Sequence, residues 1–279
     1  MSRYKRRLFT DNLMQVVATG LAVIALALLA WILVTLFAKG FHSLSVNTFT
    51  QPMDAPAGSS GLANAIVGSL IMVALATVVA APIGVMAGTY LSEIGGNTKL
   101  ANSIRFINDV LLSAPSILIG LFVYNIAVKP FHGFSGIAGV MALGIVILPV
   151  VVRATEDMLR LVPGSLREAA FALGAPQWKV ITDVMWRAAR AGIVTGMLLA
   201  LARAAGETAP LIFSSSGAQA WTFNLTKQMS NLPVTIYQYA QEPAQDKVDL
   251  AWAGALIITL GVLLLNISSR AVLAGTGRK

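Results

Sequence analysis

The sequence has no cysteine, only two histidines and few charged residues of any kind. The absence of cysteine excludes a disulfide framework, a thiolate metal site and a cysteine nucleophile. His42 and His132 lie far apart, beside polar or Gly-rich sequence, so we interpret them as loop residues. Charged residues make up 11% of the chain, against about a quarter in ordinary soluble domains. We therefore expect no metal site, no bound cofactor and no cluster of catalytic side chains.

Long apolar runs occupy most of the chain. Hydrophobic residues make up 56% of the sequence, and the mean hydropathy is +0.75. Several runs exceed the length of about 20 residues that a helix needs to cross the hydrocarbon core of a membrane. We predict an all-α fold, a polytopic membrane helical bundle with six transmembrane helices. The expected spans cover residues 16–37, 62–91, 104–128, 134–152, 188–213 and 249–269.

The spans define a simple domain organisation. Residues 1–15 are expected to form an N-terminal segment, 16–271 the six-helix membrane domain and 272–279 a short tail. The basic start followed by apolar sequence resembles a signal peptide, but the apolar run is long enough to span, and no cleavage site follows it. Pro82 and Pro115 lie inside expected spans. A membrane bundle tolerates such residues because neighbouring helices satisfy the freed backbone groups.

The distribution of lysine and arginine predicts the orientation in the membrane. With a cytoplasmic N-terminus, fifteen of these residues fall on the cytoplasmic side, four fall outside, and Arg203 lies within a span. Positive residues concentrate on the cytoplasmic side of membrane proteins, so both termini are expected to be cytoplasmic. The basic residues are spread over several loops, which argues against a nucleic-acid partner.

The longest cytoplasmic loop, about 153–187, is predicted to hold two short helices. Ser165 and Glu168 fit a capping box that starts the first helix. Gly174 is expected to end the first helix in a left-handed conformation. Pro176 is expected to open the second helix, about 177–186. Small and apolar side chains repeat at helical spacing along the first helix: Leu166, Ala169, Ala170 and Leu173. Such a pair of helices fits a groove on a partner protein, but it also fits the lipid surface or packing on its own bundle alone.

One stretch of this loop resembles a known family. Glu168, Ala169 and Ala170, followed after three residues by Gly174, are similar to the coupling loop of ABC importer permeases. The resemblance implies that the loop docks into a cleft on a separate ATP-hydrolysing subunit. The chain has no Gly-rich phosphate loop of its own, so we expect nucleotide to bind to that partner and this chain not to be an enzyme.

The fifth expected span contains two opposite charges, Arg203 and Glu207, four residues apart and followed by Thr208. Charged residues within a membrane are costly and usually face the bundle interior or a water-filled path. The two side chains are therefore either a neutralising structural pair or part of an anion path, in which the arginine fork suits phosphate oxygens. The residues alone leave both interpretations open.

The same stretch carries a second resemblance. Arg203 to Leu211, with Asp109 to Ile117 and Gly120 in the third span, is similar to the signature of phosphate-specific ABC importer permeases, A-type subunit. This resemblance implies a bacterial inner-membrane permease for phosphate that pairs with a second phosphate permease, two copies of an ABC ATPase subunit and a phosphate-binding protein. It places Arg203, Glu207 and Thr208 on the substrate path. A permease for molybdate or sulfate is an alternative, and a secondary transporter a weaker one.

Three further features carry expectations. We expect Glu93, beside Gly95 and Gly96, to be a solvated loop charge, and Asp109 to stabilise the start of the third span. The segment 214–248 is either a receptor for a binding protein or a plug that packs on its own bundle, and its mixed polar and aromatic sequence does not decide between them.

Overall fold

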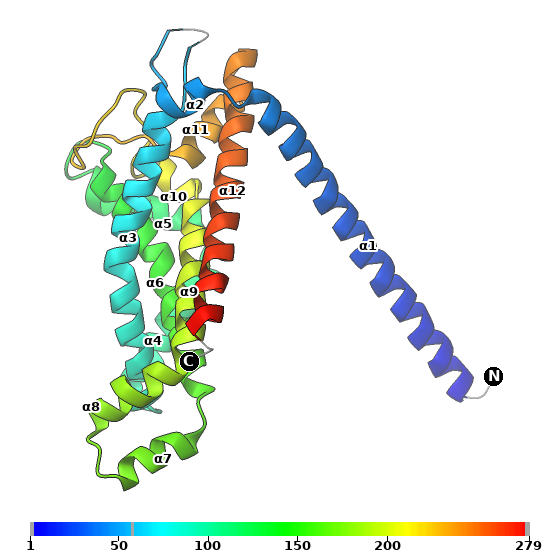
Figure 1. Ribbon diagram of the computed structural model, residues 1–279, viewed down its shortest axis with the longest axis vertical. Coiled ribbons are helices and arrows are strands. Elements are labelled where there is room, and N and C mark those ends of the chain that lie inside the picture. Colours follow the sequence, from blue (N-terminus) through cyan, green and yellow to red (C-terminus); the bar gives the residue numbers. More distant parts are fainter. Residues whose placement is uncertain (1–2, 57–58, 277–279) are drawn as a thin grey trace.

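A computed structural model describes residues 3–56 and 59–276, apart from the side chains of residues 5, 6, 8 and 268–276. The described residues form helices and no strand, with one isolated bridge between Ser216 and Met229. Figure 1 shows a bundle of roughly parallel long helices, from which α1 leans away. Within these residues, five helices are long and apolar enough to cross a membrane, or six if one bent pair forms a single span. The prediction of an all-α membrane bundle is confirmed.

The centre of the bundle is the contact between α3 (Ala63–Thr89) and α6 (Gly136–Arg160). Glycines on α3 allow the two backbones to approach closely. A Cβ atom on Gly84 would lie 2.8 Å from the Val151 Cβ atom, and one on Gly88 would lie 2.6 Å from the Val152 carbonyl oxygen. α3 continues as one further π-helical turn, η1 (Tyr90–Ile94). α3 and α6 therefore form a closely packed unit.

Two further long helices complete the bundle. Residues 177–205 form one continuous helix, made of α8 (Gln177–Lys179), η3 (Val180–Met185) and α9 (Trp186–Ala205). The last helix, α12 (Gln245–Thr276), packs against α9 and against the short α11 (Leu232–Tyr239). The helices α6 and α12 extend beyond the expected spans.

The first helix, α1 (Arg3–Ser43), has an apolar window of which no residue is buried in this chain. It meets the bundle near its C-terminal end, where a Cβ atom on Gly40 would lie 2.7 Å from the Leu256 Cβ atom and where the Lys39 ammonium lies 4.9 Å from the centre of the Trp252 ring. The short α2 (Val46–Thr50) leads from there to α3. The apolar surface of α1 is available to lipid or to another protein.

The third expected span is broken, which corrects the prediction of a continuous helix. It consists of α4 (Lys99–Ser113) and α5 (Ser116–Val123), which continues as η2 (Tyr124–Val128), with a bend of 105° between the two parts. Proline disfavours the helical conformation of the preceding residue, and Ala114 has an extended backbone with ψ 135°. Pro115 therefore ends α4.

The segment that precedes α11 contains two different parts. Met229 and Asn231 are buried, and the carbonyl oxygens of Leu225 and Lys227 accept hydrogen bonds from backbone amides at the start of α6. Trp221 and Phe223 stack on each other, and more than 40% of each side chain is exposed. The segment therefore packs on its own bundle through one part and presents aromatic rings through the other.

Candidate functional site

The predicted coupling loop lies at one end of the bundle. Figure 1 shows α7 (Gly164–Ala172) and α8 beyond the ends of the long helices, at the end toward which the first residues of α1 and the last residues of α12 also point. The segment before α11 lies at the opposite end. The loop, with α7 as its outermost helix, is thus placed where a protein on that side would meet it.

The start of α7 differs from the prediction. The N-cap residue is Pro163, with ψ 135° and no side-chain capping hydrogen bond. The predicted capping box of Ser165 and Glu168 is wrong, because the helical backbone already begins at Gly164 and places Ser165 inside the first turn. Glu168 is exposed and is free to face a partner.

The end of α7 agrees with the prediction. Gly174 has φ +79°, in the left-handed region that favours glycine, and its amide donates to the Phe171 carbonyl oxygen. The Ala175 amide donates to the Ala170 carbonyl oxygen and completes the turn. A Cβ atom on Gly174 would meet nothing within 4 Å, so the conformation, and not a lack of space, requires glycine here.

The predicted apolar stripe of α7 divides into two faces. Ala170 is buried in a cluster with Val162, Val180 and Met185. Leu166 is 45% exposed, Ala169 is exposed, and Leu173 is 89% exposed. One face therefore anchors α7 to its own bundle, and the other faces outward with apolar side chains.

The second predicted helix of the loop does not end at residue 186. It begins after Pro176, as expected, but continues without a break into the fifth span as far as Ala205. The expected pair of short helices is therefore one short helix, α7, followed by the beginning of a long one. The apolar residues Ile181 and Met185 continue the helical pattern, so the sequence contains no stop signal at this position.

Two charges that the sequence left separate form an ion pair beneath α7. The Arg167 Nε and Nη2 atoms donate to the two carboxylate oxygens of Glu93, at 3.0 and 2.9 Å. The Glu93 side chain is 3% exposed. The expectation of a solvated loop charge is wrong, because the π-helical turn η1 directs this side chain toward the loop and not toward water.

A second buried carboxylate lies at the same end. Glu156 on α6 is 3% exposed and is held by Arg105 at 2.8 Å and Arg160 at 2.6 Å. A buried carboxylate is tolerated only where it is paired and hydrogen-bonded. Asp109 lies in the middle of α4, 60% exposed and 3.7 Å from Arg153, so it does not stabilise a helix N-terminus as expected.

The predicted substrate-path residues lie at a helix end. The fifth expected span ends at Ala205 with Gly206 as its C-cap, so Arg203 lies in the last turn of α9 and Glu207 lies beyond it. The Arg203 Nε atom is 3.4 Å from Glu207 Oε1, and the two side chains are 46% and 14% exposed. Thr208 is half-buried and is the N-cap of α10 (Ala209–Ile212). The expectation of a pair deep inside a continuous helix is therefore wrong.

The structure brings together the two separate motifs that carried the second resemblance. α10 packs against α5, and a Cβ atom on Gly120 would lie 2.8 Å from the Pro210 Cα atom. Both short helices follow a break in a longer helix, at Pro115 and at Gly206. Interrupted helices inside membrane bundles occur where backbone is buried in protein or lines a cavity. The two interruptions form one structural unit.

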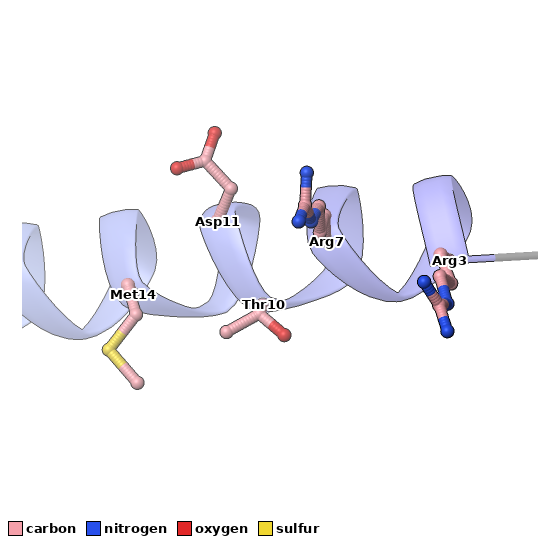
Figure 2. Close-up of a pocket in the computed structure, with 5 residues that line it drawn as sticks. All are labelled: Arg3, Arg7, Thr10, Asp11 and Met14. Carbon is pink, nitrogen blue, oxygen red and sulfur yellow. The ribbon is translucent and has the colours of Figure 1, made fainter.

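Two surface hollows lie away from these residues. Figure 2 shows the first, along the start of α1, where Asp11 and Met14 project to different sides of a single helix that has no second wall opposite it. The second is an apolar groove of about 350 Å³ between α3, α9, α11 and α12. Neither hollow contains a residue of the predicted path or loop. Among the described residues, no group of three His, Asp or Glu residues is placed to hold a metal ion.

Comparison with solved structures identifies the fold. The chain superimposes on a subunit of the inward-facing MetNI methionine ABC transporter with a TM-score of 0.64 and 18% identity, covering 77% of this chain and 95% of that one. It also superimposes on a chain of a bacterial alginate ABC transporter with a TM-score of 0.67 and 12% identity, covering 96% of both. The fold is that of a membrane subunit of an ABC transporter.

Sequence comparison gives the family. Residues 80–277 match the model of the binding-protein-dependent transport system inner membrane component, and the chain belongs to this family. A relative from Pasteurella multocida, named phosphate transport system permease protein PstA, is 54% identical over 87% of this chain and 86% of its own length. Relatives with that name in Xylella fastidiosa and, as a probable one, in Methanocaldococcus jannaschii are 47% and 30% identical over at least 94% of both chains. The chain is a transport subunit and not an enzyme.

Proposed function

We propose that this chain is the permease subunit of an ATP-driven phosphate importer. The names of its relatives support phosphate as the substrate. The proposed assembly contains a second phosphate permease, two copies of an ABC ATPase subunit and a phosphate-binding protein. An arginine fork would accept sulfate or molybdate by the same hydrogen bonds, so the preference for phosphate rests on the relatives.

One observation carries the proposed coupling to ATP hydrolysis. α7 stands at the end of the bundle with Glu168, Ala169 and the Gly174 turn exposed, while Ala170 anchors it from behind. A short helix fixed on one side and apolar on the other suits insertion into a groove of a partner protein. Glu168, Ala169, Ala170 and Gly174 are the residues of the proposed ATPase contact.

The substitution Ala169→Asp tests this contact. A carboxylate at this position would lose its water on docking without gaining a partner, which is unfavourable. We expect normal membrane abundance, loss of the ATPase subunit on co-purification and loss of phosphate uptake. Asn97→Asp adds the same charge to an exposed turn at the same end of the molecule and is the control. Retention of the ATPase subunit by the Ala169→Asp variant would reject the docking assignment.

A second test uses the left-handed turn. Gly174→Ala places a side chain at φ +79°, at a cost of about 1–2 kcal/mol, and shifts the end of α7. We expect reduced uptake, and better uptake in Gly174→Asn because asparagine tolerates this conformation. Unchanged uptake in Gly174→Ala, with normal membrane abundance, would show that this turn does not set the position of α7.

The proposed substrate path passes the end of α9. Arg203 is 46% exposed in the single chain, so its guanidinium has room to meet an anion or a second permease. The Glu207 carboxylate lies 3.4 Å from the Arg203 Nε atom, and Thr208 is the N-cap residue of α10. Forked charge-assisted hydrogen bonds are the strongest that a protein offers to a phosphate group.

The proposed orientation places α7, α8 and both chain ends in the cytoplasm. The excess of lysine and arginine in the corresponding segments supports it. The location is the inner membrane of a bacterium, with the segment before α11 on the outer side, where a phosphate-binding protein would dock. The exposed apolar surface of α1 is available for the second permease.

A further inference from the structure

Two of the contacts that join α7 to the rest of the chain are of different kinds. The first is apolar: Ala170 packs into the cluster formed by Val162, Val180 and Met185, which belong to the loop and the beginning of the long helix that ends as α9. The second is the ion pair between Arg167 and Glu93. This ion pair links the outermost helix to the end of α3, although 74 residues separate its partners in the sequence.

The geometry of the ion pair makes it directional. Two parallel hydrogen bonds of 3.0 and 2.9 Å join the guanidinium to both carboxylate oxygens, and the Ser92 hydroxyl donates to Glu93 Oε1 at 2.9 Å. A bidentate arginine–carboxylate pair fixes relative orientation as well as distance. The apolar packing of Ala170 does not, because dispersion and hydrophobic attraction have no preferred direction.

The other side of the same helical turn is also held. The Arg105 Nη2 atom donates to the Leu91 carbonyl oxygen at 2.7 Å and Nη1 to the Gly96 carbonyl oxygen at 2.8 Å, while Nε is paired with Glu156 on α6. The Trp186 indole also donates to the Thr89 hydroxyl at 3.0 Å. The turn η1 is thus fastened to α4, α6 and α7, and Thr89, the last residue of α3 before it, is hydrogen-bonded to α9.

Above this turn, α3 is closely packed on α6. The contacts of Gly84 with the Val151 side chain and of Gly88 with the Val152 backbone leave no space even for a methyl group. Packed helices of this kind move as a unit or not at all, because closely packed interiors transmit displacement. A displacement imposed on η1 would therefore be passed to the centre of the bundle.

We propose that the Glu93–Arg167 ion pair is the positioning contact that transmits the movement of α7 to the α3–α6 unit. The inference rests on the proposed function, because α7 must be moved by an ATPase for the contact to matter. Single π-helical turns occur frequently at functional sites, and η1 places Glu93 under Arg167. Neither residue touches the substrate or nucleotide in this proposal. Both act through the helices that they join.

The test separates coupling from docking. The complete transporter, with Glu93→Gln or Arg167→Gln in this chain, is purified with its partners and reconstituted in liposomes. The ratio of ATP hydrolysed per phosphate imported is then measured. We expect full retention of the ATPase subunit and a rise in this ratio of about fivefold or more, the lower end of typical coupling effects. Asp157→Asn is the control, since its ion pair with Arg153 lies within one helix. An unchanged ratio, or loss of the ATPase subunit, would overturn the proposal.

A covalent replacement of the ion pair gives an independent result. The chain contains no cysteine, so Glu93→Cys with Arg167→Cys introduces the only two thiols in this subunit. Linking them with a short bifunctional thiol reagent should return the ratio of ATP hydrolysed per phosphate imported toward that of the unmodified transporter. Without the reagent, the ratio of the double-cysteine variant should remain raised. Failure to link, or a ratio still raised after complete linking, would contradict the proposal.

If the proposed function is wrong, the variants give a different set of results. If α7 does not contact an ATPase, the Ala169→Asp variant keeps its ATPase subunit. If α7 does make this contact but the ion pair is not the transmitting element, Ala169→Asp loses the subunit while the Glu93 and Arg167 variants keep a normal ratio.

Discussion

At the scale of single residues, Arg203 has two possible roles: a structural ion pair with Glu207, or a contact with the transported anion. Its ion pair with Glu207 is long, at 3.4 Å, and the arginine side chain is 46% exposed. The Glu207 side chain is 14% exposed, but an ion pair of this length with one well-exposed partner contributes only about 0–1 kcal/mol to stability. The pair is therefore a weak structural element in the single chain, which favours a role in transport over one in holding the bundle together.

A double-mutant cycle of Arg203→Gln and Glu207→Gln tests that role. If Arg203 meets the passing anion, removal of both charges leaves phosphate uptake absent even where membrane abundance is normal. Arg203→Lys should also fail, because lysine keeps the charge but loses the fork. Uptake and abundance are scored separately for the four proteins of the cycle and for Arg203→Lys. Recovery of uptake in the double variant would make Arg203 a structural residue.

Glu93 shows what could not be predicted at this scale. The neighbouring Gly95 and Gly96 suggested a solvated turn, whereas the side chain is 3% exposed and paired with Arg167. No local pattern connects two residues that lie in different segments, so their contact depends on how the helices assemble. By contrast, the left-handed conformation of Gly174 followed from its place after a short helical pattern and is confirmed.

At the scale of elements, proline explains both the success and the failure of the predicted spans. Pro82 and Pro149 lie inside continuous helices, but Pro115 separates α4 from α5. The surroundings decide which outcome follows, because neighbouring helices must satisfy the backbone groups that proline frees. The break at Gly206 did have a local signal, since glycine at a helix end and Pro210 shortly after it are typical of a stop followed by a new helix.

The contact between α5 and α10 leads to a prediction about stability. Gly120→Ala would force a methyl group to within 2.8 Å of the Pro210 Cα atom, and such overpacking costs about 1–3 kcal/mol. Gly144→Ala is the matched control on α6, where a Cβ atom meets nothing within 4 Å and alanine favours the helix by about 0.5–1 kcal/mol. The midpoint temperature of thermal unfolding in detergent should fall for Gly120→Ala and should stay the same or rise for Gly144→Ala. Equal effects would show that α10 does not pack as described.

At the scale of the whole molecule, the two ends of the bundle differ in kind. One end carries α7 and the buried ion pairs of Glu93 and Glu156, and the other carries the segment with the stacked Trp221 and Phe223. The apolar spans and the position of the loop between two of them could be predicted from hydropathy, but not the break in the third span. The lean of α1 could not, because an apolar helix has the same sequence pattern whether it packs on its own bundle, on lipid or on a partner.

The orientation of the whole molecule is tested by labelling single cysteines. Lys179→Cys on α8 and Lys99→Cys at the start of α4 should react with impermeant thiol reagents only from the cytoplasmic side. Lys227→Cys and Lys39→Cys should react only from outside. All four side chains are exposed in the chain, so access depends on the side of the membrane and not on burial. Labelling of Lys179→Cys from outside would place α7 away from ATP.

The most direct measurement is the uptake of radioactive phosphate by liposomes that contain the complete transporter, with ATP supplied on the side of α7 and the binding protein on the other. We expect phosphate to accumulate only with ATP, and a large excess of sulfate or molybdate not to reduce its uptake. Uptake of sulfate or molybdate in place of phosphate, or phosphate uptake driven by an ion gradient without ATP, would contradict the proposed function.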